Sequence, residues 1–187
     1  MSDSTQLFKN SHEALTFAFN YSSQHYALSP MSKLMTVDAI GSGKGLVSQD
    51  GAAQAGLIHA QVGKLSPEQR ACIVARYSPR FAECQCCGSR DKVLQEYQEA
   101  ISTLGQWAVS TFTGMSVRTA REYVVRSYFE KGLTIRAIAE QSKVGKTTLY
   151  DYKSKITEKL KIIDHQAQIS ISDFLQQITE ESHGEES

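Results

Sequence analysis

The sequence predicts an all-α protein, a multi-helix body that carries a C-terminal helix-turn-helix. Three observations support this fold class: apolar residues recur at helical spacing, helix start signals punctuate the chain, and no segment shows the alternation of a half-buried strand. We divide the 187 residues into three parts. These are an N-terminal helical body with a Gly/Ser loop and a cysteine loop (1–90), a helical region with the helix-turn-helix at 133–162 (91–163), and an acidic C-terminal tail (164–187).

The first helices of the body are predicted from their start signals and apolar spacing. Ser11 is expected to cap a helix over EALTFAFNYSS, and residues 30–37 form a short second segment. The glycine-rich GSGKG at 41–45 then breaks the pattern and predicts a loop. Ser48 begins the next helix, which should run to about Gly63.

The clearest helix start in the chain is SPEQ at 66–69. A serine cap, a proline at the first helical position and a glutamine three residues after the cap predict a capping box. This helix should end near Tyr77. Residues 78–90 hold the cysteines without clear periodicity, and longer helices are expected over 91–112 and 116–131.

Charge is unevenly distributed along the chain, although the net charge is zero. Residues 1–112 carry nine Lys/Arg against nine Asp/Glu, residues 113–162 carry eleven against five, and residues 163–187 carry six acidic residues and no Lys or Arg. A neutral body, a basic block and an acidic end indicate nucleic acid as the partner of the block. A solvated helical face that happens to be basic would give the same pattern.

The basic block contains the pattern of a helix-turn-helix. Residues 132–134 end one helix and begin the next, with Thr134 as the N-cap. Ala139 supplies the small residue that is needed where the two helices cross closely. The apolar core positions of the motif, and the stripe that continues along its second helix, are Ile138, Val144, Leu149, Tyr152, Ile156, Leu160 and Ile163.

Residues off that stripe are the candidate DNA contacts. The N-terminal turn of a recognition helix meets base edges in the major groove, flanking Lys, Thr and Tyr side chains hold phosphates, and the helix terminus adds partial positive charge. Two residues depart from the usual pattern: Lys143 stands where the turn usually has glycine, and Ser142 where an apolar residue is usual. The predicted DNA-binding residues are Arg136, Gly145, Lys146, Thr147, Thr148, Tyr150, Asp151, Ser154 and Lys155.

A weaker copy of the pattern lies upstream, at 112–124. Gly114 falls at a turn, Ser116 is expected to cap a helix, and Arg118 and Arg121 would point outward. The segment is either an ordinary helix that packs beneath the helix-turn-helix or a second DNA-contacting element, such as an auxiliary phosphate clamp.

Two Gly-Lys pairs are similar to the end of a nucleotide-binding P-loop, but neither fits that motif. A P-loop needs a glycine five residues before the Gly-Lys pair, so that backbone N–H groups can wrap the phosphates. Glu140 takes that place before Gly145, and Asp38 takes it before Gly43. No nucleophile is paired with a base and no carboxylates are arranged for acid–base work, so the sequence predicts that the protein is not an enzyme.

The cysteine cluster CQCCG at 84–88 contains half of a zinc ribbon. A four-ligand site would also need Cys72 from the preceding helix, or His59 in place of one cysteine, and a chain that folds back tightly. We therefore expect reduced thiols, no metal ligands and no cofactor. Zinc at the Cys84/Cys87 loop is the alternative.

The order of these features resembles the phage and prophage late-gene antitermination proteins of the Q type, specifically the all-helical kind of lambdoid phage 21. The shared features over residues 11–162 are a helix with EALTFAF, a Gly/Ser loop, a helix with AAQAGLI, the segment LSPEQRACIVARYS, a cysteine cluster, a long helix, and LTIRAIAEQSKVGKTTLYDYKSKI. The resemblance implies a transcription regulator that binds DNA at a late promoter, loads onto paused bacterial RNA polymerase and suppresses terminators. It also implies that residues 145–155 read the DNA site and that the neutral N-terminal body contacts polymerase.

Two other classes of DNA-binding protein remain open. A phage terminase small subunit joins a helix-turn-helix to oligomerisation helices, and a simple repressor needs only a DNA-binding domain and a dimer interface. The expected partners are double-stranded DNA and bacterial RNA polymerase, and a homo-oligomer is left open. The chain has no recognisable signal peptide and no run of 18 apolar residues, so we expect no membrane partner and a place in the cytoplasm of a bacterial host cell.

Overall fold

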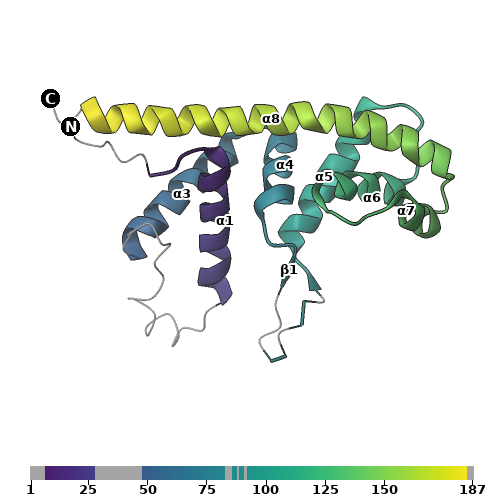
Figure 1. The fold of residues 1–187 in the computed structure, drawn as a ribbon, viewed down its shortest axis with the longest axis horizontal. Helices are drawn as coiled ribbons and strands as arrows, with labels where there is room; N and C mark the ends of the chain where they lie inside the picture. Colours follow the sequence, from purple (N-terminus) through teal and green to yellow (C-terminus); the bar gives the residue numbers. More distant parts are fainter. Residues whose placement is uncertain (1–6, 28–47, 83–85, 88, 91, 185–187) are drawn as a thin grey trace. The chain divides into compact units, whose positions relative to one another are not determined.

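The computed structural model describes residues 7–27, 48–82, 86–87, 89–90 and 92–184. This part of the chain is predominantly helical, as the sequence predicts, with seven helices and one two-stranded sheet (Figure 1). The chain divides into two compact units: unit 1 holds residues 1–65 and 168–187, and unit 2 holds residues 66–167. The elements are α1 (Ser11–Ala27), α3 (Ser48–Lys64), α4 (Pro67–Tyr77), β1 (Phe81–Ala82), β2 (Lys92–Val93), α5 (Gln95–Thr111), α6 (Arg118–Phe129), α7 (Ile135–Ser142) and α8 (Lys146–Gly184).

Unit 1 combines α1 and α3 with the last part of α8. Its buried apolar residues include Leu15 of α1, Ile58 of α3 and Ile171 of α8. The imidazole of His59 also links α3 to α1, because its Nε2 lies 3.2 Å from the carbonyl oxygen of Ala18. Burial of these side chains from water is the main force that holds the unit together.

The start of α1 differs from the prediction in its capping residue. The side-chain oxygen of Asn10, not that of Ser11, accepts a hydrogen bond from the Glu13 amide at 2.8 Å. The Glu13 carboxylate in turn accepts a hydrogen bond from the Lys9 amide at 2.8 Å. Both asparagine and serine make good caps, and here Asn10, three residues before Glu13, is the residue whose side chain reaches the free N–H group of the first turn.

The second helix of unit 1 agrees with its prediction, because α3 begins at Ser48 and ends one residue after Gly63. The segment predicted at 30–37 and the loop predicted at 41–45 lie outside the described residues. Among the described helices, none combines the length and the apolar character that a membrane span requires.

Unit 2 begins with α4, whose start is confirmed in detail. The Ser66 hydroxyl accepts a hydrogen bond from the Gln69 amide at 3.3 Å, and the Gln69 side chain accepts one from the Ser66 amide at 3.2 Å. Pro67 occupies the first turn, where its missing N–H group costs nothing. The helix ends at Tyr77, as predicted, and buries one apolar face that includes Ile73.

A small hairpin follows α4 and corrects two expectations. Phe81 pairs with Val93 and Ala82 with Lys92 in an antiparallel register, although we predicted no strand. The same pairing moves the start of α5 from position 91 to Gln95, because Lys92 and Val93 take extended conformations. Two residues per strand are too few to produce a readable alternation, so the sequence could not reveal this sheet.

The start of α6 also differs from the prediction. Its N-cap is Val117, which makes no side-chain hydrogen bond, so Ser116 does not cap the helix. The predicted turn at Gly114 is present, and this glycine has a φ of 86°. Arg118 is exposed as expected, but Arg121 is buried among the apolar residues of α6 and does not point outward.

The last helix, α8, runs without a break for 39 residues from Lys146 to Gly184. Most of the segment that we separated as an acidic C-terminal tail is therefore the last part of α8 (Figure 1, green to yellow). Residues up to Ala167 belong to unit 2 and the following residues to unit 1. Both Ala167 and Ile171 are fully buried, so α8 contributes core residues to both units.

Candidate nucleic-acid interface

The first element of the candidate interface is α7, which begins as predicted. The Thr134 hydroxyl accepts a hydrogen bond from the Ala137 amide at 3.3 Å and so satisfies one of the free N–H groups of the first turn. Ile135 and Ile138 are buried and fix the inner face of the helix. Ala139, which we expected at the close crossing, is half-buried.

The turn between α7 and α8 contains the two residues that depart from the expected pattern. Lys143 has φ 56° and ψ 25°, the left-handed conformation for which glycine is the usual residue. The backbone therefore turns at the position where the sequence pattern places glycine, at a cost of about 1 kcal/mol for a residue with a Cβ atom. Ser142 is half-buried, and its hydroxyl donates a hydrogen bond to the Ile138 carbonyl at 2.7 Å, which satisfies the polar group there.

The predicted apolar stripe of α8 is confirmed over its first four members. Leu149, Ile156 and Leu160 are fully buried, and Tyr152 is nearly so. The hydroxyl of Tyr152 donates a hydrogen bond of 2.6 Å to the carbonyl of Gly114, in the loop before α6. The stripe fixes the rotation of α8 and therefore determines which of its residues face water.

The fifth predicted member of the stripe is replaced by a charged residue. Ile163 is only half-buried, and Asp164 is buried in the next position. Its carboxylate accepts hydrogen bonds from Arg76 of α4 and from the Tyr128 hydroxyl of α6, the latter at 3.1 Å. Arg76 also lies over the rings of Tyr128 and Phe129. We name the residues Arg76, Tyr128 and Asp164 the buried triad after its buried carboxylate; Tyr128 is half-buried, and one third of the Arg76 side chain is exposed.

The buried triad changes the acidity of two of its members. Burial, together with the charge and the hydrogen bond of Asp164, raises the pKa of Tyr128 to about 12. Burial alone would lower the pKa of Arg76, but the hydrogen bond and the charge of Asp164 outweigh this effect and raise it. The triad therefore joins α4, α6 and α8 through one ionised pair and one neutral phenol.

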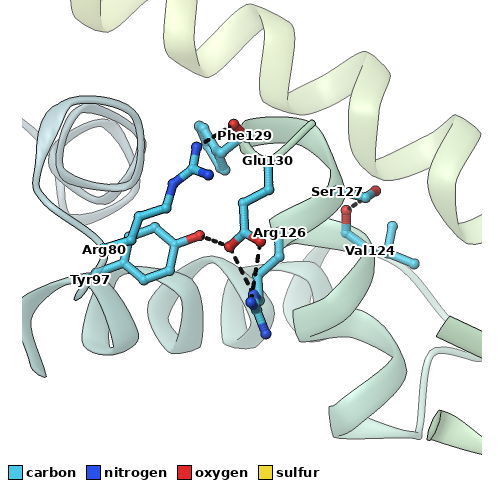
Figure 2. Close-up of polar contacts among 7 residues, drawn as sticks. All are labelled: Arg80, Tyr97, Val124, Arg126, Ser127, Phe129 and Glu130. Carbon is cyan, nitrogen blue, oxygen red and sulfur yellow. Dashed lines mark hydrogen bonds and ion pairs between the residues drawn. The ribbon is translucent and has the colours of Figure 1, made fainter. Parts of the chain in front are cut away.

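A second polar cluster lies at the same, C-terminal end of α6 (Figure 2). The Glu130 carboxylate accepts a hydrogen bond from the Tyr97 hydroxyl of α5 and pairs with Arg126 at 2.9 Å. Arg80 donates a hydrogen bond of 2.8 Å to the carbonyl of Phe129. Burial opposes ionisation of Glu130, but the bonds from Arg126 and Tyr97 outweigh it and lower the pKa of this carboxyl. Together these bonds hold the end of α6 from which the chain enters α7.

The outer face of the α7–α8 pair carries the residues that we predicted as DNA contacts. All nine are exposed, and the exposed fraction of Tyr150 is 63%. The first turn of α8 contains no acidic residue, so the partial positive charge of this helix end is not offset there. The nine residues are Arg136, Gly145, Lys146, Thr147, Thr148, Tyr150, Asp151, Ser154 and Lys155.

Two ion pairs on this face involve predicted contacts. Arg136 pairs with Glu140 at 3.2 Å, and Lys155 pairs with Asp151 at 2.9 Å; all four side chains are more than half exposed to solvent. Exposed pairs of this spacing contribute only about 0.3–0.5 kcal/mol. A phosphate group could therefore replace either acidic partner at little cost to the fold.

The surroundings of Gly145-Lys146 exclude the P-loop geometry. A P-loop follows a buried β-strand. Here the preceding element is the helix α7, and Glu140 lies within it. The chain before Gly145 is therefore a helix followed by the short turn at Lys143 and Val144, and not a strand followed by a glycine-rich cradle.

The cysteines and the histidine considered as zinc ligands do not form a group in the described residues. Cys72 is fully buried in α4, Cys86 and Cys87 are exposed, and Cys84 lies outside the described part of the chain. Where side chains are described, no three His, Cys, Asp or Glu residues lie close enough to hold a metal ion. Burial, and then the nearby charge of Asp164, raise the pKa of the Cys72 thiol to about 12, which disfavours the thiolate that zinc needs.

The sequence reasoning missed the buried triad. One signal was present, because Asp164 follows Leu160 by one helical turn and so continues the apolar stripe with an acid. Its partners, Arg76 and Tyr128, lie 88 and 36 residues away along the chain, so no local pattern could identify them.

Comparison with protein-family models and with curated proteins finds no match to this chain.

Proposed function

We propose that this protein is a sequence-specific DNA-binding transcription regulator in which α7, the turn at 143–145 and the start of α8 act as a helix-turn-helix. The observation that carries this proposal is the division of α8 into two faces. The buried stripe from Leu149 to Leu160 leaves Lys146, Thr147 and their neighbours in water. This is the arrangement that docking into the major groove requires.

The chemistry of the exposed face supports a DNA ligand. The N–H groups at the start of α8 and the ammonium group of Lys146 attract phosphate oxygens. Thr147 and Tyr150 offer hydroxyl groups that can donate hydrogen bonds to phosphates or to base edges. The basic block at 113–162, with eleven Lys/Arg against five Asp/Glu, favours approach to a polyanion.

The proposal extends to transcription antitermination. The resemblance to Q-type proteins implies that the chain loads onto bacterial RNA polymerase at a late promoter and suppresses termination. The amount of helical structure outside α7 and the start of α8 supports a large protein partner, because a repressor needs little more than a dimerisation helix. A terminase small subunit would use the same extra structure to assemble into a ring, and a repressor would bind a palindrome and block transcription.

The DNA-binding step is tested by measuring affinity for duplex DNA against salt concentration. With about five Lys/Arg neutralising phosphates, a plot of log affinity against log salt should have a slope of about −4 to −5. Lys146→Ala and Thr147→Ala should each weaken binding about tenfold and leave the melting temperature unchanged. Lys64→Ala, at the exposed end of α3, removes the same charge away from the proposed face and should have no effect.

Two results would overturn the DNA-binding proposal. One is no binding by the wild-type protein at low salt on any duplex from a library of random sequences. The other is an affinity that does not depend on salt. ATP and GTP should not bind. Micromolar affinity for either nucleotide would support a nucleotide-binding P-loop at Gly145-Lys146.

The antitermination step is tested with a template that joins a cognate promoter to an intrinsic terminator. Purified protein should raise read-through by bacterial RNA polymerase, and replacing the promoter should abolish the effect because loading needs the DNA site. Unchanged read-through together with a stable ring of subunits would favour a terminase small subunit. Binding to a palindrome with reduced initiation would favour a repressor.

A further inference from the structure

The N-terminal end of α6 lacks the acidic residue or capping hydroxyl that offsets the partial positive charge at most of the other described helix starts. α1, α4 and α5 each carry a glutamate in the first turn, and α7 has the Thr134 hydroxyl as its cap. The 12-residue helix α6 has no acidic residue in its first turn, and its N-cap, Val117, makes no side-chain hydrogen bond. The free N–H groups of this end therefore keep their partial positive charge.

A buried arginine lies beneath the same helix start. Arg121, in the first turn of α6, has an exposed fraction of 6% and donates a hydrogen bond from Nη1 to the carbonyl of Met115, in the loop before the helix. Its Nε is buried and has no hydrogen-bond partner, and no carboxylate among the described residues pairs with it. An unpaired buried cation is costly, and a nearby anion would lower that cost.

The exposed residues at the start of α6 offer groups that can hold an anion directly. Ser116 and Thr119 are exposed, and so is Arg118, whose side chain is 73% accessible to solvent. Arg118 makes two exposed contacts, one with the Glu122 carboxylate at 2.7 Å and one with the Ser102 hydroxyl of α5 at 3.2 Å. An anion at the helix start could replace Glu122 as its partner, because exposed pairs of this kind add little stability.

The loop before α6 is attached to α8 close to the proposed DNA-reading turn. The hydrogen bond from Tyr152 to the Gly114 carbonyl, at 2.6 Å, joins the two elements. Tyr152 follows Lys146 by six residues, which is about 9 Å along a helix axis. The major groove is about 12 Å wide. A phosphate at the border of the groove could therefore reach the start of α6 while the start of α8 lies in the groove.

We propose that residues 114–119, with Arg121 behind them, form a second binding site for a phosphate of the DNA backbone. The N–H groups at the start of α6, the Ser116 and Thr119 hydroxyls and the Arg118 guanidinium hold the phosphate oxygens, and Arg121 supplies positive charge from below. The site contacts no base, so it contributes to affinity and to the orientation of α8 but not to sequence preference. This inference rests on the proposed DNA binding by α8.

The first test places a carboxylate at the helix start of the full-length protein. Thr119→Glu should occupy the site with its own negative charge and weaken binding to the best duplex at least tenfold. The same change should leave the melting temperature equal or higher, because an acidic residue stabilises a helix N-terminus. Thr119→Gln removes the same hydroxyl without adding charge, so it should weaken binding by only about two- to threefold, clearly less than Thr119→Glu. Opposite effects on binding and on stability separate a phosphate site from a structural role.

The second test removes or releases the exposed cation. Arg118→Gln should weaken binding about five- to tenfold at low salt and reduce the slope of log affinity against log salt by about one, as expected for one lost phosphate contact. Glu122→Gln frees Arg118 from its carboxylate partner and should strengthen binding about threefold. Both effects should be the same on specific and on random-sequence duplexes.

The outcomes distinguish this inference from the proposed function. If the wild type binds, Thr147→Ala weakens binding and Thr119→Glu and Arg118→Gln bind like the wild type, the second phosphate site is wrong and the role of α8 stands. If Thr119→Glu weakens binding but also lowers the melting temperature, the loss is structural and the site is again wrong. No binding by the wild type at low salt overturns both proposals.

Discussion

Two stretches of α8 within unit 2 use charged residues in opposite ways. At the start of the helix, Asp151 and Lys155 are exposed and pair only with each other, one turn apart. Farther along, Asp164 is buried and pairs with Arg76 and Tyr128, which come from two other helices. The exposed pair can be exchanged for a ligand at little cost, whereas the buried triad fixes the helix against α4 and α6. The same helix thus carries an exposed, weakly stabilising pair near its start and a buried, stabilising carboxylate farther along.

The largest effect should come from placing a charge on the buried face of the first stretch. Leu149→Asp should unfold the region around 133–162, a loss of roughly 4 kcal/mol or more, because the carboxylate has no partner in the core. Tyr150→Asp, at the next and exposed position, should change stability by less than about 0.5 kcal/mol. Thermal unfolding followed by circular dichroism measures both. A folded Leu149→Asp protein beside an unfolded Tyr150→Asp protein would show that the helix is rotated from the orientation described here.

The comparison between the two stretches is tested directly by matched substitutions of aspartate. Asp164→Asn should cost about 2–3 kcal/mol, somewhat less than the usual loss for a fully buried pair because one third of the Arg76 side chain is exposed. Asp151→Asn should cost less than about 0.5 kcal/mol. Urea unfolding of the two variants gives both values. Equal losses of unfolding free energy in the two variants would contradict the distinction between a stabilising buried pair and an exchangeable exposed pair.

Alkaline pH should lower the free energy of unfolding of unit 2, because the pKa values of Cys72 and Tyr128 are raised in the folded protein. Burial and the charge of Asp164 raise the pKa of Cys72 from 9.0 to about 12 and the pKa of Tyr128 from 10.0 to about 12. Because each folded pKa exceeds the unfolded one, the stability that these groups contribute is fully present below about pH 9 and is lost as the pH rises towards 12.

The Cys72 contribution can be isolated by substitution. Between pH 9 and 10 the wild type should lose about 1 kcal/mol of unfolding free energy to ionisation of this thiol in the unfolded chain. Cys72→Ala should lose correspondingly less over that interval, although it is less stable at every pH because of the cavity. Cys86→Ala, at an exposed thiol, should follow the wild-type curve. An identical pH dependence in the Cys72→Ala protein would contradict the assignment.

The smallest effect concerns the turn that precedes the exposed stretch. Lys143→Gly should stabilise the protein by about 0.5–1 kcal/mol, because glycine adopts the left-handed conformation without the strain of a Cβ atom. Lys143→Ala removes the charge but keeps the Cβ atom, so it should not stabilise the protein. Calorimetric melting curves of the two variants make the comparison, and a stabilised alanine variant would assign the gain to the lost charge and not to the backbone.

The sequence predicted many of the features that depend on neighbouring residues, although the caps expected at Ser11 and Ser116 are not formed by those residues. The capping box at Ser66, the cap at Thr134 and the buried stripe from Leu149 to Leu160 all follow from contacts within one or two helical turns. The exposed face of α8 followed from the stripe, because a helix that buries one side must expose the other. The candidate interface was therefore accessible to local reasoning.

Features that depend on residues far apart in the chain could not be predicted in the same way. Arg121 was expected to point outward in the pattern at 112–124, yet it is buried and donates a hydrogen bond to the Met115 carbonyl in the preceding loop. Asp164 is buried only because Arg76 arrives from α4. The hairpin at 81–93 depends on pairing between two very short strands. The partner of Asp164 lies far outside the window in which periodicity is visible, and the two strands are too short to show any. Arg121 bonds to a carbonyl only six residues away, but that carbonyl lies in a loop, which no helical period describes.

The continuity of α8 limits how the length of this chain can change during evolution. A loop tolerates an inserted or deleted residue, but one residue added to a helix turns everything after it by about 100°. Between Leu160 and Ile171 such a change would move Ala167 or Ile171 out of a core and bring a polar neighbour in. Homologous chains should therefore keep a constant number of residues across this interval, and insertions and deletions should collect elsewhere.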